Sequence, residues 1–122
     1  MGYESRLIIV DRIGIKTRKG EYIIAEEIAR FNLCGVPWNH GQIFTTPIDF
    51  DIQVTDGERI KYKKTDCYGE HCHMADLDTV IREIERLSSE DSYRRYKPIL
   101  GLLKGFDSGE WNELKVVHYG YW

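Results

Sequence analysis

The stretch from Ile48 to Val54 constrains the fold more than any other part of the chain. Apolar residues occupy every second position, and polar residues lie between them. Side chains of a strand point alternately to opposite faces, so this pattern is typical of a strand with one buried face. Asp56-Gly57 follows as a turn signal, and Arg59–Lys63 alternates in the same way. The two segments together predict a β-hairpin.

The register of this hairpin can be predicted from the burial that each loop length allows. A one-residue slip moves every side chain to the other face, and a two-residue loop at Asp56-Gly57 would set apolar residues opposite charged ones. We therefore expect a three-residue loop, Thr55–Gly57, closed by a left-handed Gly57. The cross-strand pairs are then Val54 with Glu58, Ile52 with Ile60, and Phe50 with Tyr62.

The basic run 59–64 is expected to be neutralised within the same hairpin. The predicted register sets Asp51 opposite Lys61 and Asp49 opposite Lys63 on the outer face, and such pairs stabilise a sheet. The whole chain carries 17 Lys and Arg against 20 Asp and Glu, a formal net charge of −3. A protein held mainly by phosphate contacts is usually basic, so nucleic acid is not expected as the main partner.

Four segments before this hairpin can be assigned in outline. Segment 5–13 is apolar and β-branched in its middle, which predicts a strand buried on both faces. Segment 14–20 reads as a basic turn. Segment 21–34 fits a helix or a strand, and we favour a long strand that pairs with 5–13. Segment 35–46 is predicted to be a loop.

The second half of the chain predicts two helices and a last strand. Apolar residues at helical spacing and Asp76 as an N-cap predict a helix over 76–88. A second helix is expected over 91–104, with a kink or break near Lys97 because Pro98 follows. Residues 114–119 read as a strand. This order predicts an α+β fold in a single domain, 1–122, with a mostly antiparallel sheet of about five strands and two helices packed on one face.

A cytoplasmic location is expected. The longest apolar run, Leu7–Val10, is far shorter than the ~20 residues of a membrane-spanning helix, and the first residues do not resemble a signal peptide. The three cysteines are an odd number, which argues against a secreted disulfide framework.

The loop 67–73 is the most unusual stretch, because Cys67, Cys72 and His73 are metal-donor residues. Zinc is usually held by four Cys or His ligands, and Cys34 and His40 could complete a site if their loop folds over. A polar surface loop with reduced cysteines is the simpler interpretation. A Cys67–Cys72 bridge, or a Cys72 thiol whose pKa is lowered by a following helix N-terminus, is a third. No cofactor other than this zinc is suggested.

Two segments are candidates for binding a partner. Residues 93–97 combine tyrosines with cations, and guanidinium groups bind phosphate or carboxylate, so Arg94, Arg95, Tyr96 and Lys97 suit an anionic nucleotide or an acidic protein surface. A solvated helix face is the simpler interpretation. The tail is rich in aromatic residues, and Tyr121 and Trp122 would form an interface patch or a homo-oligomer contact if exposed. Docking of this tail into the core is the alternative.

Three parts of the chain resemble small uncharacterised proteins of bacteriophages and prophages, mostly of Gram-positive hosts. They are the opening Met1–Arg6, the run Tyr93–Tyr96 before Pro98, and the ending Trp111 with Val116–Gly120. The resemblance covers about half the chain and brings no catalytic residues with it. It implies an accessory protein that acts in the host cytoplasm.

The expected function is therefore binding rather than catalysis. We expect a non-enzymatic phage protein that counters a host defence system by binding a defence protein, as an anti-CRISPR-like inhibitor would. The alternatives are a sponge for a nucleotide second messenger and a small zinc-binding module or enzyme built on Cys67, Cys72 and His73. No membrane partner is expected.

Overall fold

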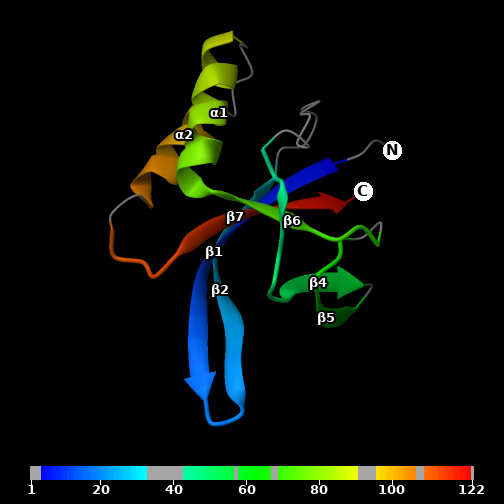
Figure 1. Cartoon of the computed structure of the whole chain (residues 1–122). Coiled ribbons are helices and arrows are strands. Elements are labelled where there is room, and N and C mark those ends of the chain that lie inside the picture. Colours follow the sequence, from blue (N-terminus) through cyan, green and yellow to red (C-terminus); the bar gives the residue numbers. More distant parts are fainter. Residues whose placement is uncertain are drawn as a thin grey trace.

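The computed structural model describes residues 4–32, 43–56, 58–66, 69–90, 96–106 and 109–121. Two helices and seven strands lie in these ranges (Figure 1). In chain order they are β1 (Glu4–Thr17), β2 (Gly20–Asn32), β3 (Thr46–Pro47), β4 (Ile52–Asp56), β5 (Arg59–Lys63), β6 (His73–Asp76), α1 (Leu77–Glu90), α2 (Tyr96–Gly105) and β7 (Leu114–Tyr121).

The main sheet has five strands in the order β2-β1-β7-β6-β3, and all of its pairings are antiparallel. The predicted α+β class with a mostly antiparallel five-stranded sheet is therefore confirmed. The membership of the sheet differs from the expectation, because β4 and β5 form a separate two-stranded sheet. Their places are taken by β6 and the short β3, which the sequence did not predict.

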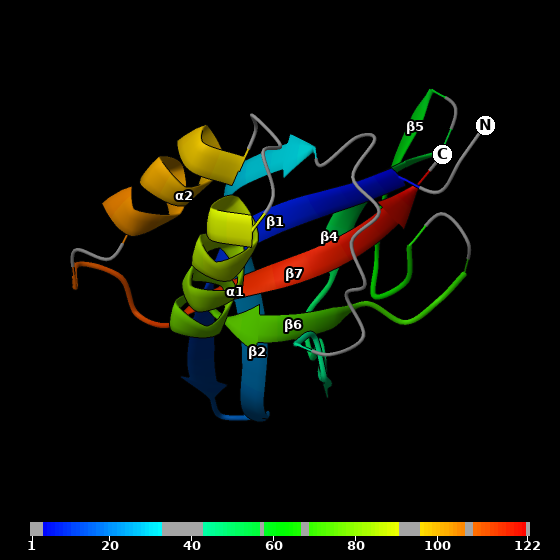
Figure 2. The same cartoon turned by 90° about the horizontal axis from the view of Figure 1, so that it is seen from above.

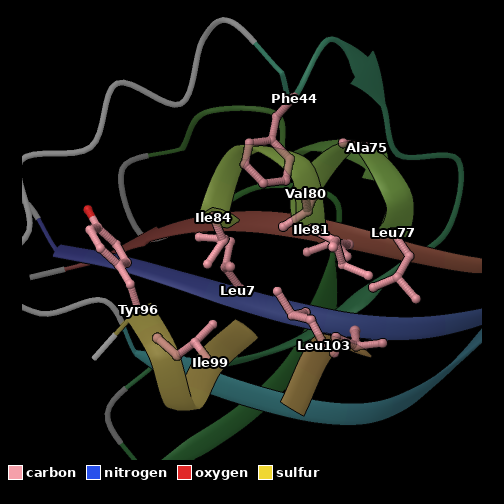
Figure 3. Close-up of a cluster of buried hydrophobic side chains, with 12 residues drawn as sticks. Leu7, Phe44, Ala75, Leu77, Val80, Ile81, Ile84, Tyr96, Ile99 and Leu103 are labelled. Atoms are coloured by element: carbon pink, nitrogen blue, oxygen red, sulfur yellow. The ribbon is translucent and has the colours of Figure 1, made fainter. Parts of the chain in front are cut away.

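Strand β1 lies in the centre of the molecule and is covered on both faces, as its apolar run predicts. Leu7 and Ile9 point to the helices, and Ile8 and Val10 point to the opposite face, where β4 packs. Figure 2 shows α1 and α2 over one face of the sheet and β4 on the other side. Figure 3 shows Leu7 between the side chains of α1 and those of α2.

The two helices share the core beside β1. Helix α1 confirms the prediction over 76–88 and buries Val80 and Ile84 completely. Helix α2 begins at Tyr96, so Pro98 lies in its first turn. A proline there loses no helical hydrogen bond, because the first amides of a helix have no partner within it. The expected kink or break near Lys97 stays a prediction, because residues 91–95 lie outside the described residues and the described helix starts at Tyr96.

The first two strands form a long hairpin. Strand β2 confirms the strand assignment of segment 21–34 as far as Asn32, and its pairing with β1; residues 33 and 34 lie outside the described residues. The predicted turn over 14–20 is too long, because β1 continues to Thr17 and the turn is only Arg18-Lys19. Strand β7 pairs with β1 no further than Asp11. Beyond that residue the hairpin extends away from the helices (Figure 1).

The predicted hairpin over 48–63 exists, but its extent and register were wrong. Strand β4 begins at Ile52, and the pairing aligns Thr55 with Ile60 and Gln53 with Tyr62. The physical reason is that Ile52 and Val54, with Ile48 and Phe50, are buried against the main sheet. These contacts bury the apolar side chains of β4, so β5 is not needed to cover them.

The charge pairs predicted from that register were also wrong. Asp51 accepts a hydrogen bond from Lys64 Nζ at 2.7 Å. Asp49 Oδ1 accepts one from Arg12 Nε at 3.0 Å, and the same guanidinium donates to Glu113 Oε2 at 3.0 Å. Arg12 therefore joins β1 to two segments that are far apart in the chain.

Neither described helix is both long and apolar enough to cross a membrane.

Candidate protein-binding surface

Strand β5 presents the most exposed large apolar side chains in the described part of the chain. Ile60 is 59% exposed and Tyr62 is 68% exposed. They are two residues apart, so both side chains lie on the same face of β5. Gln53 and Thr55 lie opposite them on β4. We call the face formed by Gln53, Thr55, Ile60 and Tyr62 the β5 face.

The opposite side of β5 is cationic. Arg59, Lys61 and Lys63 alternate with the apolar pair and lie across from Asp56, Val54 and Ile52. Among the described strands, β5 pairs with β4 alone. At many protein interfaces apolar anchors are central and the rim is polar. Ile60 and Tyr62 can supply such anchors, while the cations of β5 point to its other face.

The sequence assigned Ile60 and Tyr62 to the core, so it missed this surface. The alternation of β5 is the same whether its apolar face is covered or open, and no residue within β5 distinguishes the two cases. The missing information is that β4 obtains its cover from the main sheet. That contact joins residues about 40 positions apart.

The residues predicted to bind a partner are only partly described. Arg94, Arg95 and Trp122 lie outside the described residues. Tyr96 is 2% exposed and belongs to the core beside α1, so its ring is covered by the protein itself. Lys97 is exposed on α2. Tyr121 ends β7, where its backbone pairs with Glu4.

The predicted zinc ligands can be tested only in part, because Cys67, Cys34 and His40 lie outside the described residues. Cys72 is buried, and this burial raises the pKa of its thiol to about 12. The expectation of a lowered Cys72 pKa was wrong, because β6 separates this residue from α1. Among the described residues no group of three metal-donor side chains comes together.

The two histidines of this segment bind backbone oxygens. His71 Nε2 lies 3.1 Å from the carbonyl oxygen of Ile48, and His73 Nδ1 lies 2.9 Å from that of His71. The contact of His71 holds the 71–73 segment against the chain that precedes β4, and that of His73 lies within the segment. The contact of His73 uses Nδ1, so a metal ion at this ring would bind through Nε2.

A cleft of about 460 Å³ lies where α1 begins and β7 begins. Lys115 lies in its wall and binds Asp76 Oδ1 at 2.5 Å and Glu113 Oε1 at 3.3 Å. The hydrogen bond to Asp76 raises the Lys115 pKa, with a further contribution from Glu113. Lys115 is thus already bound by two carboxylates, whereas Arg82, the other cation of the lining, lies 3.4 Å from the carbonyl oxygen of Asp78.

Comparison with protein-family models, with curated proteins and with solved structures finds no match to this chain.

Proposed function

We propose that this protein is a non-enzymatic binding protein that counters a host defence system by occupying a defence protein through the β5 face. The observation that carries the binding mode is the exposure of Ile60 and Tyr62 on one face of β5. Burying two such side chains in an interface contributes roughly 1.5–3 kcal/mol each, more than scattered surface residues supply.

The chemistry of β5 favours a protein partner with an apolar pocket and an acidic rim. Aromatic anchors carry much of the binding energy in protein interfaces, and the cations Arg59 and Lys63 add steering toward acidic surfaces. The assignment of the partner to host defence rests on the resemblance of the two chain ends and of residues 93–96 to bacteriophage proteins.

The test is capture and measurement of the partner. Tagged protein is used to capture proteins from a Gram-positive host lysate, and each captured protein is purified and titrated against the wild type and two variants. We expect the Ile60→Ser/Tyr62→Ser double variant to bind at least about tenfold more weakly, since removal of anchors costs more than 1 kcal/mol each.

Leu102→Ser provides the matched control. Leu102 is also an exposed apolar residue, at 45%, but it lies on α2. It should bind as the wild type does. Unchanged affinity of the double variant, with circular dichroism showing that it is folded, would refute the proposal.

The two alternatives give different results in the same preparation. A nucleotide sponge would carry a ligand that absorbs at 260 nm and is released by mild heating. A zinc module would contain one equivalent of zinc that a Cys67→Ser variant lacks. Both stay predictions, and no contact among the described residues favours either over the β5 face.

A further inference from the structure

Strand β2 is a long edge of the main sheet. It stands at the end of the strand order, and among the described strands it pairs with β1 alone. Its 13 residues make it more than twice as long as β4 or β5. An edge strand presents a row of backbone donors and acceptors that can pair with another chain. Between Gly20 and Ala25 it holds neither lysine nor proline, which commonly protect such edges.

The backbone groups that β2 presents outward can be identified from one hydrogen bond. Arg12 N donates to Glu113 O at 2.9 Å, so the backbone of Arg12 faces the β7 side of β1. Successive residues of a strand bond alternately to the two sides, and Arg12 lies across from Ala25. The backbone groups of Ala25, Ile23 and Glu21 therefore point away from β1.

The side chains beside this edge are apolar and half exposed. Tyr22 is 50% exposed and Ile24 is 43% exposed. They pair with Ile15 and Ile13 of β1, so the four residues share one face of the projecting hairpin. The helices do not cover this part of the sheet (Figure 1).

We propose that β2 pairs antiparallel with β2 of a second copy of this chain, with the two-fold axis at Ile23. Residues whose numbers add to 46 then lie opposite each other. Ile23 faces its own copy, Tyr22 faces Ile24 twice, and Glu21 faces Ala25 twice. The turn cation Lys19 comes opposite Glu27, next to Glu26, at both ends of the paired region.

Charge and apolar complementarity favour this register over the two registers whose two-fold axis is shifted by one residue. An axis at Tyr22 sets Glu21 opposite Ile23. An axis at Ile24 sets Glu21 opposite Glu27 and Tyr22 opposite Glu26, which places like charges together. Like charges directly opposite destabilise a sheet, whereas apolar and opposite-charge pairs stabilise it.

The shape of the molecule allows this pairing. Residues 12–17 of β1 extend beyond the last pair with β7, which at ~3.3 Å per residue corresponds to roughly 20 Å of projecting hairpin. With the axis at Ile23 and the strands antiparallel, the two hairpins overlap side by side. The two bodies then lie toward opposite ends of the shared ribbon, and the turn of each hairpin comes beside Glu27 of the other copy.

The first test is a symmetric disulfide. In the proposed register the two copies of residue 23 form a hydrogen-bonded pair with a Cα separation of ~5.5 Å, which lies within the range that a disulfide spans. An Ile23→Cys variant of the full chain should form a covalent dimer under mild oxidation, with residue 23 identified in the cross-linked peptide by mass spectrometry. Wild type under the same conditions reports any dimer made by the native cysteines.

Two further cysteine variants decide the register. Tyr22→Cys tests the register with its two-fold axis at residue 22, and Ile24→Cys tests the register with its axis at residue 24. Each variant should form a disulfide-linked dimer at least about tenfold more slowly than Ile23→Cys. Faster cross-linking of either variant would overturn the proposed register. Absence of an Ile23→Cys dimer at every concentration tried would overturn the pairing itself.

The second test leaves the native cysteines unchanged. Light scattering and sedimentation across a concentration series should show that the wild type forms a dimer. The dissociation constant of the dimer should be at least about tenfold higher for Ile24→Lys, because that variant places two like charges within the paired ribbon. Ile60→Lys, the control on the β5 face, should dimerise as the wild type does. A wild type that stays monomeric, or an Ile60→Lys that is as impaired as Ile24→Lys, would overturn the proposal.

Discussion

His118 is a titratable residue that is partly buried between Leu7 of β1 and His73 of β6. Its ring lies against Phe44, with the ring centroids 5.5 Å apart, and residue 118 pairs with Leu7 in the sheet. Burial disfavours the charged imidazolium and lowers the His118 pKa from 6.5 to about 4. The neutral ring is therefore the form that fits the folded protein, and its protonation opposes folding.

This shift predicts a loss of stability in mild acid. Between pH 6.5 and about 4 the unfolded chain takes up a proton at His118 that the folded chain refuses, so the free energy of unfolding falls as the pH falls. At about pH 5 the loss should reach roughly 2 kcal/mol relative to about pH 7. His118→Phe removes the titration and should reduce the acid-dependent loss by that amount in urea unfolding. The same pH dependence in wild type and variant would show that His118 is not its source.

Asp11 shows a second way in which one residue holds the fold. Its carboxylate is buried at 4% exposure and accepts hydrogen bonds from the backbone amides of Asn112 and Glu113, at 3.3 and 2.9 Å. These bonds fix the chain where it enters β7. The sequence placed Asp11 at the end of an apolar run, and nothing local indicated that its partners lie about 100 residues away.

At the scale of elements, local sequence patterns predicted the type of helix or strand correctly. They failed to predict strand pairing where it depends on contacts between residues far apart in the chain. The apolar run of β1 and the helical spacing of α1 predicted strands and helices correctly, because those residues are buried by any fold of this class. The alternation in β4 was also correct for Ile52 and Val54. The register of β4 with β5 was not predictable, because it depends on whether β4 is covered by β5 or by the main sheet.

The β5 face was missed for the same reason. Sequence reasoning used Ile60 to cover Ile52, and this assumption removed the most exposed apolar pair from the list of candidate residues. The segments chosen instead, 93–97 and the C-terminal tail, were selected by composition. Composition could not show that Tyr96 packs in the core.

The two registers differ in a measurable way. Ile52 is 4% exposed and Ile60 is 59% exposed, so the same substitution should have different effects at the two positions. Ile52→Ala should lower the free energy of unfolding by about 2–5 kcal/mol, and Ile60→Ala should change it by no more than about 0.5 kcal/mol. Denaturant unfolding of both variants measures the difference. Similar losses at the two positions would favour the three-residue loop that the sequence predicted.

At the scale of the whole molecule, the protein combines a doubly covered centre with a projecting arm. The apolar residues of β1 are fully buried as far as Val10, and among the described strands residues 13–17 of β1 pair with β2 alone. Local opening costs least where few apolar contacts must be broken. The two ends of β1 should therefore differ in stability although they belong to one strand.

Amide hydrogen exchange should show this gradient along β1. Amides near Leu7–Val10 and near Val116–Val117 should exchange most slowly, and those of Ile13 and Ile15, which face β2, should exchange faster although they are hydrogen-bonded. The outward amides of Glu21, Ile23 and Ala25 should exchange fast in dilute protein and become protected as the concentration rises, if β2 pairs with a second copy. In Ile24→Lys that concentration dependence should disappear while the slow exchange of the centre is retained. Uniform protection along the whole of β1 in dilute protein would show instead that the arm and the centre unfold as one cooperative unit.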